Sequence, residues 1–176
     1  RRRAVGILVR SGTARSIGTL HAGAMGYSDD AAKIPAAAVT VEDAQLLDRL
    51  AKRGPVSIHL HMEDQMLPDV ESANVVGELV GKDKPDEIVV IGGHLDSWDV
   101  GQGAQDDASG AVAAMQAAYL IQKLGLHPRR TIRVVLWTGE EKGGAGAQAY
   151  RPAMGTRSPN HIPAIELSCG AEPPCG

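Results

Sequence analysis

The sequence predicts an α/β fold: a mixed, mostly parallel sheet flanked by helices. From residue 87 onward, strand-like and helix-like segments alternate, and they cover residues 87–91, 108–125, 131–137 and 145–150. A strand, a helix and a second strand in this order form a βαβ unit, and such units build parallel sheets covered by helices. The run 131–137 is apolar almost throughout, which is typical of a central strand that is buried on both faces.

The first part of the chain contains further candidate elements. Residues 4–10 form a short apolar run that suits a buried strand, whereas residues 11–30 are rich in Gly, Ser and Ala and are expected to form a loop. Thr40 and Asp43 resemble a capping box, and apolar residues recur behind them at helical spacing until Gly54. We therefore predict a helix that starts after Thr40 and ends before Gly54.

Two more strands are expected before residue 87. Apolar and polar residues alternate strictly over 56–62, which indicates a strand with one solvated face. Residues 75–80 form another strand candidate, and the charged stretch 81–86 separates it from the strand 87–91. A connection of this length is compatible with a hairpin.

Composition restricts the possible functions. The chain has 176 residues, of which 43% are hydrophobic and 22% charged, so it is neither wholly disordered nor collagen-like. A net charge of -3 predicts no binding to nucleic acid or to an anionic membrane. The sequence contains no run of about 18 apolar residues, so it predicts no membrane span. Cys169 and Cys175 are the two cysteines and exclude a disulfide scaffold. The chain begins with Arg, and we expect a fragment or a processed product.

Polar side chains gather behind two of the predicted strands. The candidate site residues are His94, Asp96, Asp106, Glu140 and Glu141. Because open α/β sheets bind their ligands outside the carboxyl ends of the strands, these side chains are expected to converge in one crevice. Crowded acidic groups repel each other unless a cation lies among them, and imidazole with carboxylates is a suitable ligand set for zinc.

The spacing of these residues indicates separate roles. Asp96 follows His94 by two positions and could hold the imidazole ring from behind, as the outer partner of a metal-bound histidine does. Glu140 and Glu141 are adjacent, so their side chains point in different directions. One of them can bind metal while the other faces the substrate as a general base.

A simpler interpretation of the same residues needs no metal. Asp106 and Asp107 could be the N-cap and a first-turn residue of the helix that follows, and His94 could be an ordinary loop histidine. Each residue taken singly favours this interpretation, whereas the combination favours a metal site.

Two longer runs, IGGHLDSWDVGQGAQDDASG and LWTGEEKGG, resemble the co-catalytic zinc exopeptidases, and the resemblance extends over most of the chain. It implies hydrolysis of peptide bonds in dipeptides or short peptides by two-metal activation of water. The segment KIPAAAVTVEDA resembles the protease-associated insert of such enzymes. The resemblance therefore implies that residues 1–54 are the C-terminal part of this insert and residues 55–176 the N-terminal portion of a zinc peptidase domain.

The resemblance also implies a role for each matching residue, with two zinc ions in a complete site. His94 would bind one zinc, Glu141 the other, and Asp106 would bridge them. Glu140 would be the general base that takes a proton from the bridging water. Asp96 would orient His94.

The chain departs from the family pattern near its end. Ser168 stands where the family has a further aspartate ligand, with Cys169 as an alternative ligand, and the last histidine ligand is absent from the sequence. At most three of the five expected metal ligands are therefore present. The second hypothesis is therefore that the chain is a catalytically inactive fragment or a binding module of the same fold. The third hypothesis is that it catalyses another reaction on this fold, such as glutaminyl cyclisation. Short peptides and a homodimer are the expected partners, and relatives of the family suggest a secreted or periplasmic location.

Other residues receive simpler interpretations. Trp98 either forms a wall of the substrate pocket or packs beside its loop. The histidines outside the site are interpreted as solvated residues: His21, His59, His61, His127 and His161.

Overall fold

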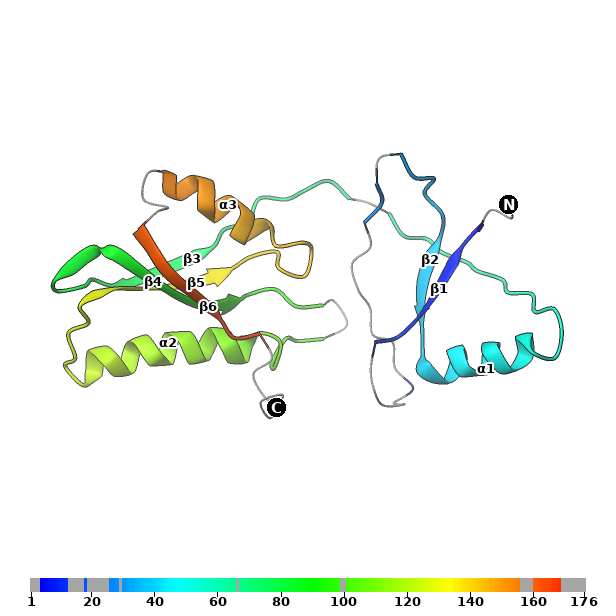
Figure 1. Cartoon of the computed structure of the whole chain (residues 1–176), viewed down its shortest axis with the longest axis horizontal. Helices are drawn as coiled ribbons and strands as arrows, with labels where there is room; N and C mark the ends of the chain where they lie inside the picture. The colour runs from blue at the N-terminus through cyan, green and yellow to red at the C-terminus, as the bar shows by residue number, and fades with distance from the viewer. Residues whose placement is uncertain are drawn as a thin grey trace. The chain divides into compact units, whose positions relative to one another are not determined.

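The computed structural model describes residues 4–12, 18, 26–28, 30–65, 67–98, 101–155 and 160–168. The chain forms two compact units, Arg1–Pro68 and Asp69–Gly176 (Figure 1). The division falls later than the predicted boundary at residue 54, so residues 55–68 belong to the first unit. The assignment of the first unit to a protease-associated insert stays a prediction.

The described residues of the first unit form two short strands and one helix. β1 (Ile7–Arg10) and β2 (Ala36–Val39) pair in parallel, and α1 (Val41–Ala51) follows β2 almost directly. Thr40 caps α1 as predicted, because its hydroxyl accepts a hydrogen bond from the backbone N–H of Asp43 at 3.0 Å. The helix after Thr40 is thus confirmed. The strand predicted over residues 4–10 is present but shorter, and most of its residues are exposed and not buried as expected.

The strand predicted over residues 56–62 is wrong. Residues 55–65 lie in no helix or strand, and the apolar side chains of this segment are exposed, as are His59 and His61. Alternation of polar and apolar residues suits any extended segment, but a strand also needs a neighbour that pairs with its backbone N–H and C=O groups. No such neighbour is found in the described part of the first unit.

The second unit is built on a four-stranded sheet with the strand order β3-β5-β4-β6. Its strands are β3 (Val75–Leu79), β4 (Lys84–His94), β5 (Arg130–Trp137) and β6 (His161–Glu166). β4 runs parallel to β5 and to β6, whereas β3 runs antiparallel to β5. The predicted fold class, a mixed and mostly parallel sheet flanked by helices, is confirmed.

The predicted hairpin between residues 75–80 and 87–91 is wrong, because β5 lies between β3 and β4. β5 is the most buried strand of the sheet, and Val135 in its centre is 0% exposed. β5, a largely apolar strand, takes the position between β3 and β4, where its side chains are buried. It does so although it follows both of these strands in the sequence. Local sequence shows where strands end, but not which strands pair.

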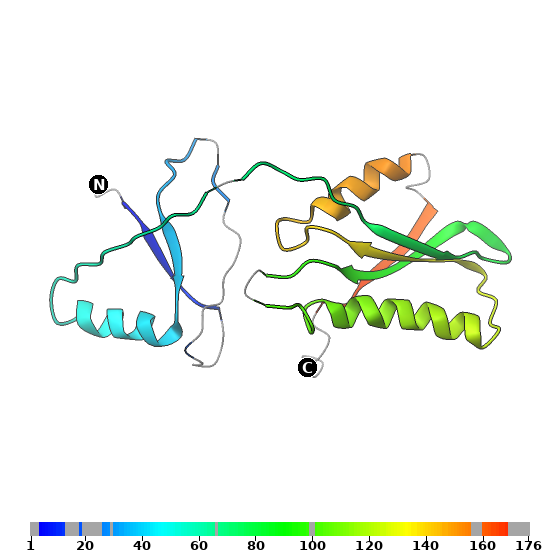
Figure 2. The same cartoon turned by 180° about the vertical axis from the view of Figure 1, so that it is seen from behind.

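Helices cover both faces of this sheet (Figures 1 and 2). The core under α2 (Ala108–Lys123) consists of Ala111, Ala114, Val134 and Leu136. The core under α3 (Ala145–Met154) consists of Ile88, Val90 and Val135, with Trp137 and Tyr150 packed against it. The helices predicted over 108–125 and 145–150 are thus confirmed. In the described part of the chain, no helix has the length and apolar character needed to cross a bilayer.

Polar contacts tie α3 to the sheet. Arg133, 5% exposed on β5, donates hydrogen bonds from Nε to Glu78 and from Nη1 to the Tyr150 hydroxyl, both at 2.6 Å. The Tyr150 hydroxyl also lies 2.9 Å from His161 Nε2. His161 is half-buried in this network, so its interpretation as a solvated surface residue is wrong. Residue type and spacing could not show that β6 brings His161 under α3.

Candidate metal centre

β4 and β5 end side by side, and the residues that follow them form the candidate site. His94, the last residue of β4, pairs in register with Trp137, the last residue of β5. The β4–α2 loop, residues 95–107, follows His94, and the β5–α3 loop, residues 138–144, follows Trp137. Because the two strands are parallel, both loops leave the sheet at the same edge, where α/β proteins bind their ligands.

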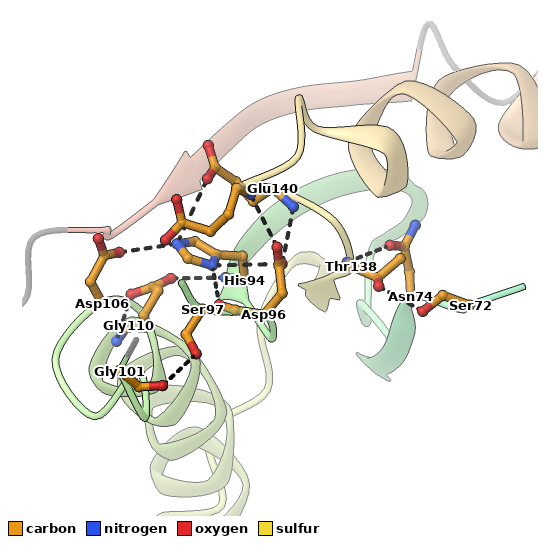
Figure 3. A network of polar contacts seen from close by, with 12 residues as sticks. Ser72, Asn74, His94, Asp96, Ser97, Gly101, Asp106, Gly110, Thr138 and Glu140 are labelled. Atoms are coloured by element: carbon orange, nitrogen blue, oxygen red, sulfur yellow. Dashed lines mark hydrogen bonds and ion pairs between the residues drawn. The ribbon is translucent and has the colours of Figure 1, made fainter. Parts of the chain in front are cut away.

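The imidazole of His94 lies at the centre of the site (Figure 3). His94 as a whole is 2% exposed. Nδ1 lies 2.8 Å from the backbone carbonyl oxygen of Asp96, and Nε2 lies 3.1 Å from Oδ1 of Asp106. Oε2 of Glu140 is 4.0 Å from the same Nε2. The carbonyl can only accept a hydrogen bond, so Nδ1 carries the proton in the neutral ring. Nε2, on the side of the carboxylates, is then available to bind a metal ion.

Two opposing effects act on the pKa of His94. Burial lowers this pKa, because it disfavours the charged ring. Hydrogen bonds to the Asp96 carbonyl and the Asp106 carboxylate, together with the charges of Asp107 and Glu140, raise it more, so the net pKa lies above its usual value. The acidic surroundings of the ring therefore attract positive charge, which a proton or a metal cation can supply.

Three of the predicted site residues could hold a metal ion together. His94, Asp106 and Glu141 each offer one ligand atom, and these atoms lie within 4.8 Å of one another. Oε1 of Glu141 is buried and has no hydrogen-bond partner among the described residues. An unpartnered buried oxygen is costly unless a cation satisfies it. One imidazole and two carboxylates fit zinc, so the residues present suit that metal.

The surroundings of Glu141 disfavour a negative charge on its carboxyl group. Burial raises the pKa of its carboxyl group, and the negative charge of Asp106 raises it further. The charge of His94 acts in the opposite direction. Glu140, by contrast, has a side chain that is 49% exposed. The two adjacent glutamates thus lie in different environments, as their spacing predicts.

Asp96 contacts the site differently from the prediction. Its carboxylate lies 3.8 Å from His94 Nδ1, which is too long for a hydrogen bond, and its backbone carbonyl makes the contact with the ring. The carboxylate instead accepts hydrogen bonds from the backbone N–H groups of Glu140 and Glu141, both at 3.0 Å. Burial raises the pKa of Asp96, but these bonds lower it more, so the net pKa lies below its usual value. Asp96 therefore links the two loops.

Asp107 is a buried residue that the sequence places only in the first turn of the following helix. It is the N-cap of α2 and is 1% exposed. Its carboxylate accepts hydrogen bonds from the backbone N–H of Gly110 at 3.1 Å and from that of His94 at 2.8 Å. The N-cap is therefore Asp107 and not Asp106, to which the simpler interpretation gave that position, and Asp106 turns towards the imidazole. Gly93 leaves room for this contact, since a Cβ there would lie 2.5 Å from Asp107 Oδ2.

The end of β6 adds one more acidic group. The pKa of Glu166 lies above its usual value. Desolvation raises this pKa most, and the charges of Asp107 and Glu140 raise it further, whereas the charge of His94 lowers it. Glu166 ends a strand that runs parallel to β4, so the rule that identified the other residues could also have found it. Ser168 lies beyond β6 outside any helix or strand, and Cys169 lies outside the described residues.

A pocket of about 280 Å³ opens beside the candidate metal ligands. Its lining residues are Ser97, Trp98, Gly101, Gly103, Ala104, Gln105, Asp106 and Glu141. Trp98 thus forms part of a pocket wall, as one of its two interpretations states. The ammonium group of Lys142 lies 5.3 Å from the centre of the Trp98 ring, within the range of a cation–π contact.

The fold and these residues define an α/β protein with a candidate metal site at the edge of its sheet. Comparison with known proteins gives the family. The model of peptidase family M28 matches residues 74–163, which include all five predicted site residues. The chain belongs to peptidase family M28. The resemblance to zinc exopeptidases is thereby confirmed.

Curated relatives agree with this assignment. Carboxypeptidase Q of Xenopus laevis is 51% identical over 148 residues, which are 84% of this chain and 32% of that protein. Carboxypeptidase Q of Bos taurus is 43% identical over 174 residues, 98% of this chain and 37% of that protein. The probable leucine aminopeptidase 2 of Aspergillus oryzae is 32% identical over 74% of this chain and 24% of that protein. The chain spans about a third of the length of the carboxypeptidase Q relatives.

Solved structures agree with the fold. The peptidase M28 precursor of Shewanella amazonensis has a TM-score of 0.83 and is 39% identical, over 97% of this chain and 39% of that one. A zinc aminopeptidase of Bacillus subtilis has a TM-score of 0.50 at 22% identity, over 55% of this chain and 24% of that one, and shows the fold alone. The alternative of a binding module without catalytic function is not favoured, because the curated relatives are named as peptidases.

Proposed function

We propose that this chain carries the metal-binding part of a zinc-dependent exopeptidase that hydrolyses dipeptides or short peptides. The observation that supports this most strongly is the cluster of His94, Asp106 and Glu141, in which a buried oxygen of Glu141 has no hydrogen-bond partner among the described residues. Relatives named carboxypeptidase and aminopeptidase support the reaction class.

His94, Asp106 and Glu141 would hold zinc in this proposal, with Asp106 shared between two ions in a complete site. Bound zinc would supply a Lewis acid that lowers the pKa of water and polarises the scissile carbonyl group. The shared position suits Asp106, because a carboxylate has two oxygens and the side chain of Asp106 is 60% exposed at the pocket.

Glu140 is the proposed general base. Its carboxylate lies next to the ligand cluster, 4.0 Å from His94 Nε2, and is half-exposed. It can therefore take a proton from the attacking water and later donate that proton to the leaving amine. The hydrogen bonds from the backbone of Glu140 and Glu141 to Asp96 fix the position of both glutamates relative to His94.

The pocket beside the ligands is the proposed substrate site. Trp98 offers an aromatic surface to a substrate side chain, and Asp106 and Glu141 belong to the same lining. A volume of about 280 Å³ is close to the lower limit of ordinary small-ligand sites, which suits a dipeptide better than a long chain.

Zinc titration tests the proposal. The chain should bind zinc, and His94→Ala should weaken the affinity about 100-fold or more, because a ligand counts for at least as much as an outer partner of the metal. His127→Ala is the matched control, since His127 is an exposed histidine away from the site, and it should bind zinc like the wild type. Equal affinity of the wild type and His94→Ala would contradict the proposal.

A second variant separates metal binding from catalysis. Glu140→Gln should retain zinc, and whatever hydrolysis of dipeptides the wild-type chain shows should fall about 100- to 10,000-fold, because general bases contribute on this scale. Release of free amino acids measures hydrolysis, and retained turnover in Glu140→Gln would exclude Glu140 as the base. The number of zinc ions bound at saturation tests whether the site holds two.

A further inference from the structure

The two ends of the β5–α3 loop, which carries Glu140 and Glu141, lie next to each other and are joined by a backbone hydrogen bond. The backbone N–H of Gly146, in the first turn of α3, donates a hydrogen bond to the carbonyl oxygen of Thr138 at 2.9 Å. The chain between these two residues therefore forms a closed loop, and the orientation of the glutamates depends on how its two ends are held.

Asn74 bridges these two ends, and Figure 3 shows its contact with Thr138. It directly precedes β3, which pairs with β5. Its Oδ1 accepts a hydrogen bond from the backbone N–H of Thr138 at 3.0 Å, and its Nδ2 donates one to the carbonyl oxygen of Gly146 at 2.8 Å. One carboxamide thus satisfies a backbone donor at the start of the loop and a backbone acceptor at its end. Only Asn and Gln offer an acceptor and a donor in this fixed arrangement.

The packing at this point leaves little space. Gly146 is buried, and a Cβ at its position would lie 2.2 Å from Asn74 Oδ1 and 2.5 Å from the Thr138 carbonyl oxygen. The carboxamide therefore lies directly against the backbone at the end of the loop. A hydroxyl contact of 2.7 Å between Ser72 and Thr138 lies beside it.

The far side of the same loop is held by Asp96, whose carboxylate accepts the backbone N–H groups of Glu140 and Glu141 at 3.0 Å each. Asn74 at the base and Asp96 at the tip restrain the loop from two directions. Asn74 comes from outside the residues that gather around His94, so any influence that it has on the site passes through the loop backbone.

We propose that Asn74 is a positioning residue for the metal site: its carboxamide holds the ends of the β5–α3 loop and so directs Glu141 towards His94 and Asp106. This rests on the proposed function in one respect, the role of Glu141 as a ligand. Loss of the bridge lets the loop shift, and the three ligand atoms then meet less often in the arrangement that binds zinc.

The test measures zinc affinity of the full 176-residue chain by competition with a chromophoric chelator. Asn74→Ala removes both hydrogen bonds and should weaken zinc binding about 10-fold or more, the effect of losing an outer partner of a metal ligand. Hydrogen exchange of the backbone amides of residues 139–145 should become faster. Asn74→Asp keeps the acceptor for Thr138 but loses the donor to Gly146, and it should also bind zinc more weakly than the wild type.

Two controls separate positioning from general destabilisation. Ser72→Ala removes the neighbouring hydroxyl contact but keeps both backbone bonds, and its zinc affinity should stay within about twofold of the wild type. Tyr150→Phe, one turn further along α3 than Gly146, removes hydrogen bonds to Arg133 and His161. It should lower stability without changing zinc affinity.

The outcomes are distinct. Wild-type affinity in Asn74→Ala overturns this inference and leaves the proposed function intact. If Asn74→Ala does not fold, wild-type affinity in Asn74→Asp overturns it equally. Absence of zinc binding by the wild-type chain overturns the proposed function and this inference together. Weaker binding in the Asn74 variants with unchanged binding in both controls supports the inference.

Discussion

The two loops that form the site are anchored in different ways. The β4–α2 loop ends in Asp107, whose carboxylate is 1% exposed and holds both the backbone of His94 and the first turn of α2. The β5–α3 loop is held by side chains from other segments, Asn74 at its base and Asp96 at its tip.

This difference separates stability from ligand geometry. Asp107 is continuous with α2, whose residues Ala111 and Ala114 lie in the core. Loss of the hydrogen bonds of Asp107 should therefore lower the free energy of unfolding of the second unit. The contacts of the β5–α3 loop are less buried, so damage there should change the position of Glu141 more than it changes the overall stability. The following variants test this comparison.

The largest loss of stability is expected for Asp107→Ala. It leaves the N–H groups of His94 and Gly110 buried without partners and should reduce the free energy of unfolding by about 3 kcal/mol. Chemical denaturation measures this change. Asp106→Ala is the matched control at the adjacent position: its side chain is 60% exposed, so its stability should change by less than about 1 kcal/mol. Equal losses in the two variants would contradict the comparison.

A smaller loss is expected at the base of the β5–α3 loop. Gly146→Ala places a methyl group 2.2 Å from Asn74 Oδ1 and 2.5 Å from a backbone oxygen, and should cost about 2 kcal/mol by overpacking. Gly77→Ala on β3 has no atom within 4 Å of the new methyl group and should be neutral or slightly stabilising. Thermal or chemical unfolding of the two variants distinguishes strain from a general glycine effect.

Asp96→Asn should cost about 1 to 2 kcal/mol in the metal-free chain, because a neutral amide replaces a charged acceptor of two N–H groups. The pKa of Asp96 is lower in the folded chain than its usual value. Its stabilising contribution is therefore present above the unfolded-state pKa of about 3.9 and is lost as the pH falls through the folded-state pKa. The stability difference between wild type and Asp96→Asn should shrink over that pH range. A constant difference would show that the carboxylate charge is not involved.

The smallest effect serves as a reference in the other unit. Thr40→Ala removes the N-cap of α1 and should cost about 1 kcal/mol. The zinc affinity should not change, because Thr40 lies in the first unit and all the site residues lie in the second. A change in zinc affinity would show that the site depends on contacts outside the second unit.

Much of the site was predictable from local sequence. Strands that end in polar residues and alternate with helices place those residues at one edge of a parallel sheet, which is why His94, Asp106 and Glu141 could be grouped before their contacts were known. Spacing suggested a role for Asp96 and a division of roles between Glu140 and Glu141, and the family resemblance implied that Glu140 is the base and Glu141 the ligand. The contact between the Asp96 carboxylate and the β5–α3 loop was not predictable, because its donors are the backbone N–H groups of Glu140 and Glu141, and residue types and spacing do not show where these groups point.

Other features also depended on distant partners. The segment 56–62 has the pattern of a strand but no neighbour in the described residues, and β3 pairs with β5 rather than with β4, which follows it in the chain. From the sequence, Asn74 is an ordinary polar residue before a strand. Its partners in the β5–α3 loop, Thr138 and Gly146, follow it by 64 and 72 positions, and only the fold brings them together.

The sequence by itself determined the local elements, the apolar central strand and the acidic residues that follow the strands, because periodicity and short-range spacing encode these features. The tertiary structure alone decided the strand order, the burial of His161, the loss of all partners for Glu141 Oε1 among the described residues, and the bridge made by Asn74. These depend on backbone groups and side chains far apart in the chain, whose pairing is selected by burial and hydrogen bonding in the complete fold.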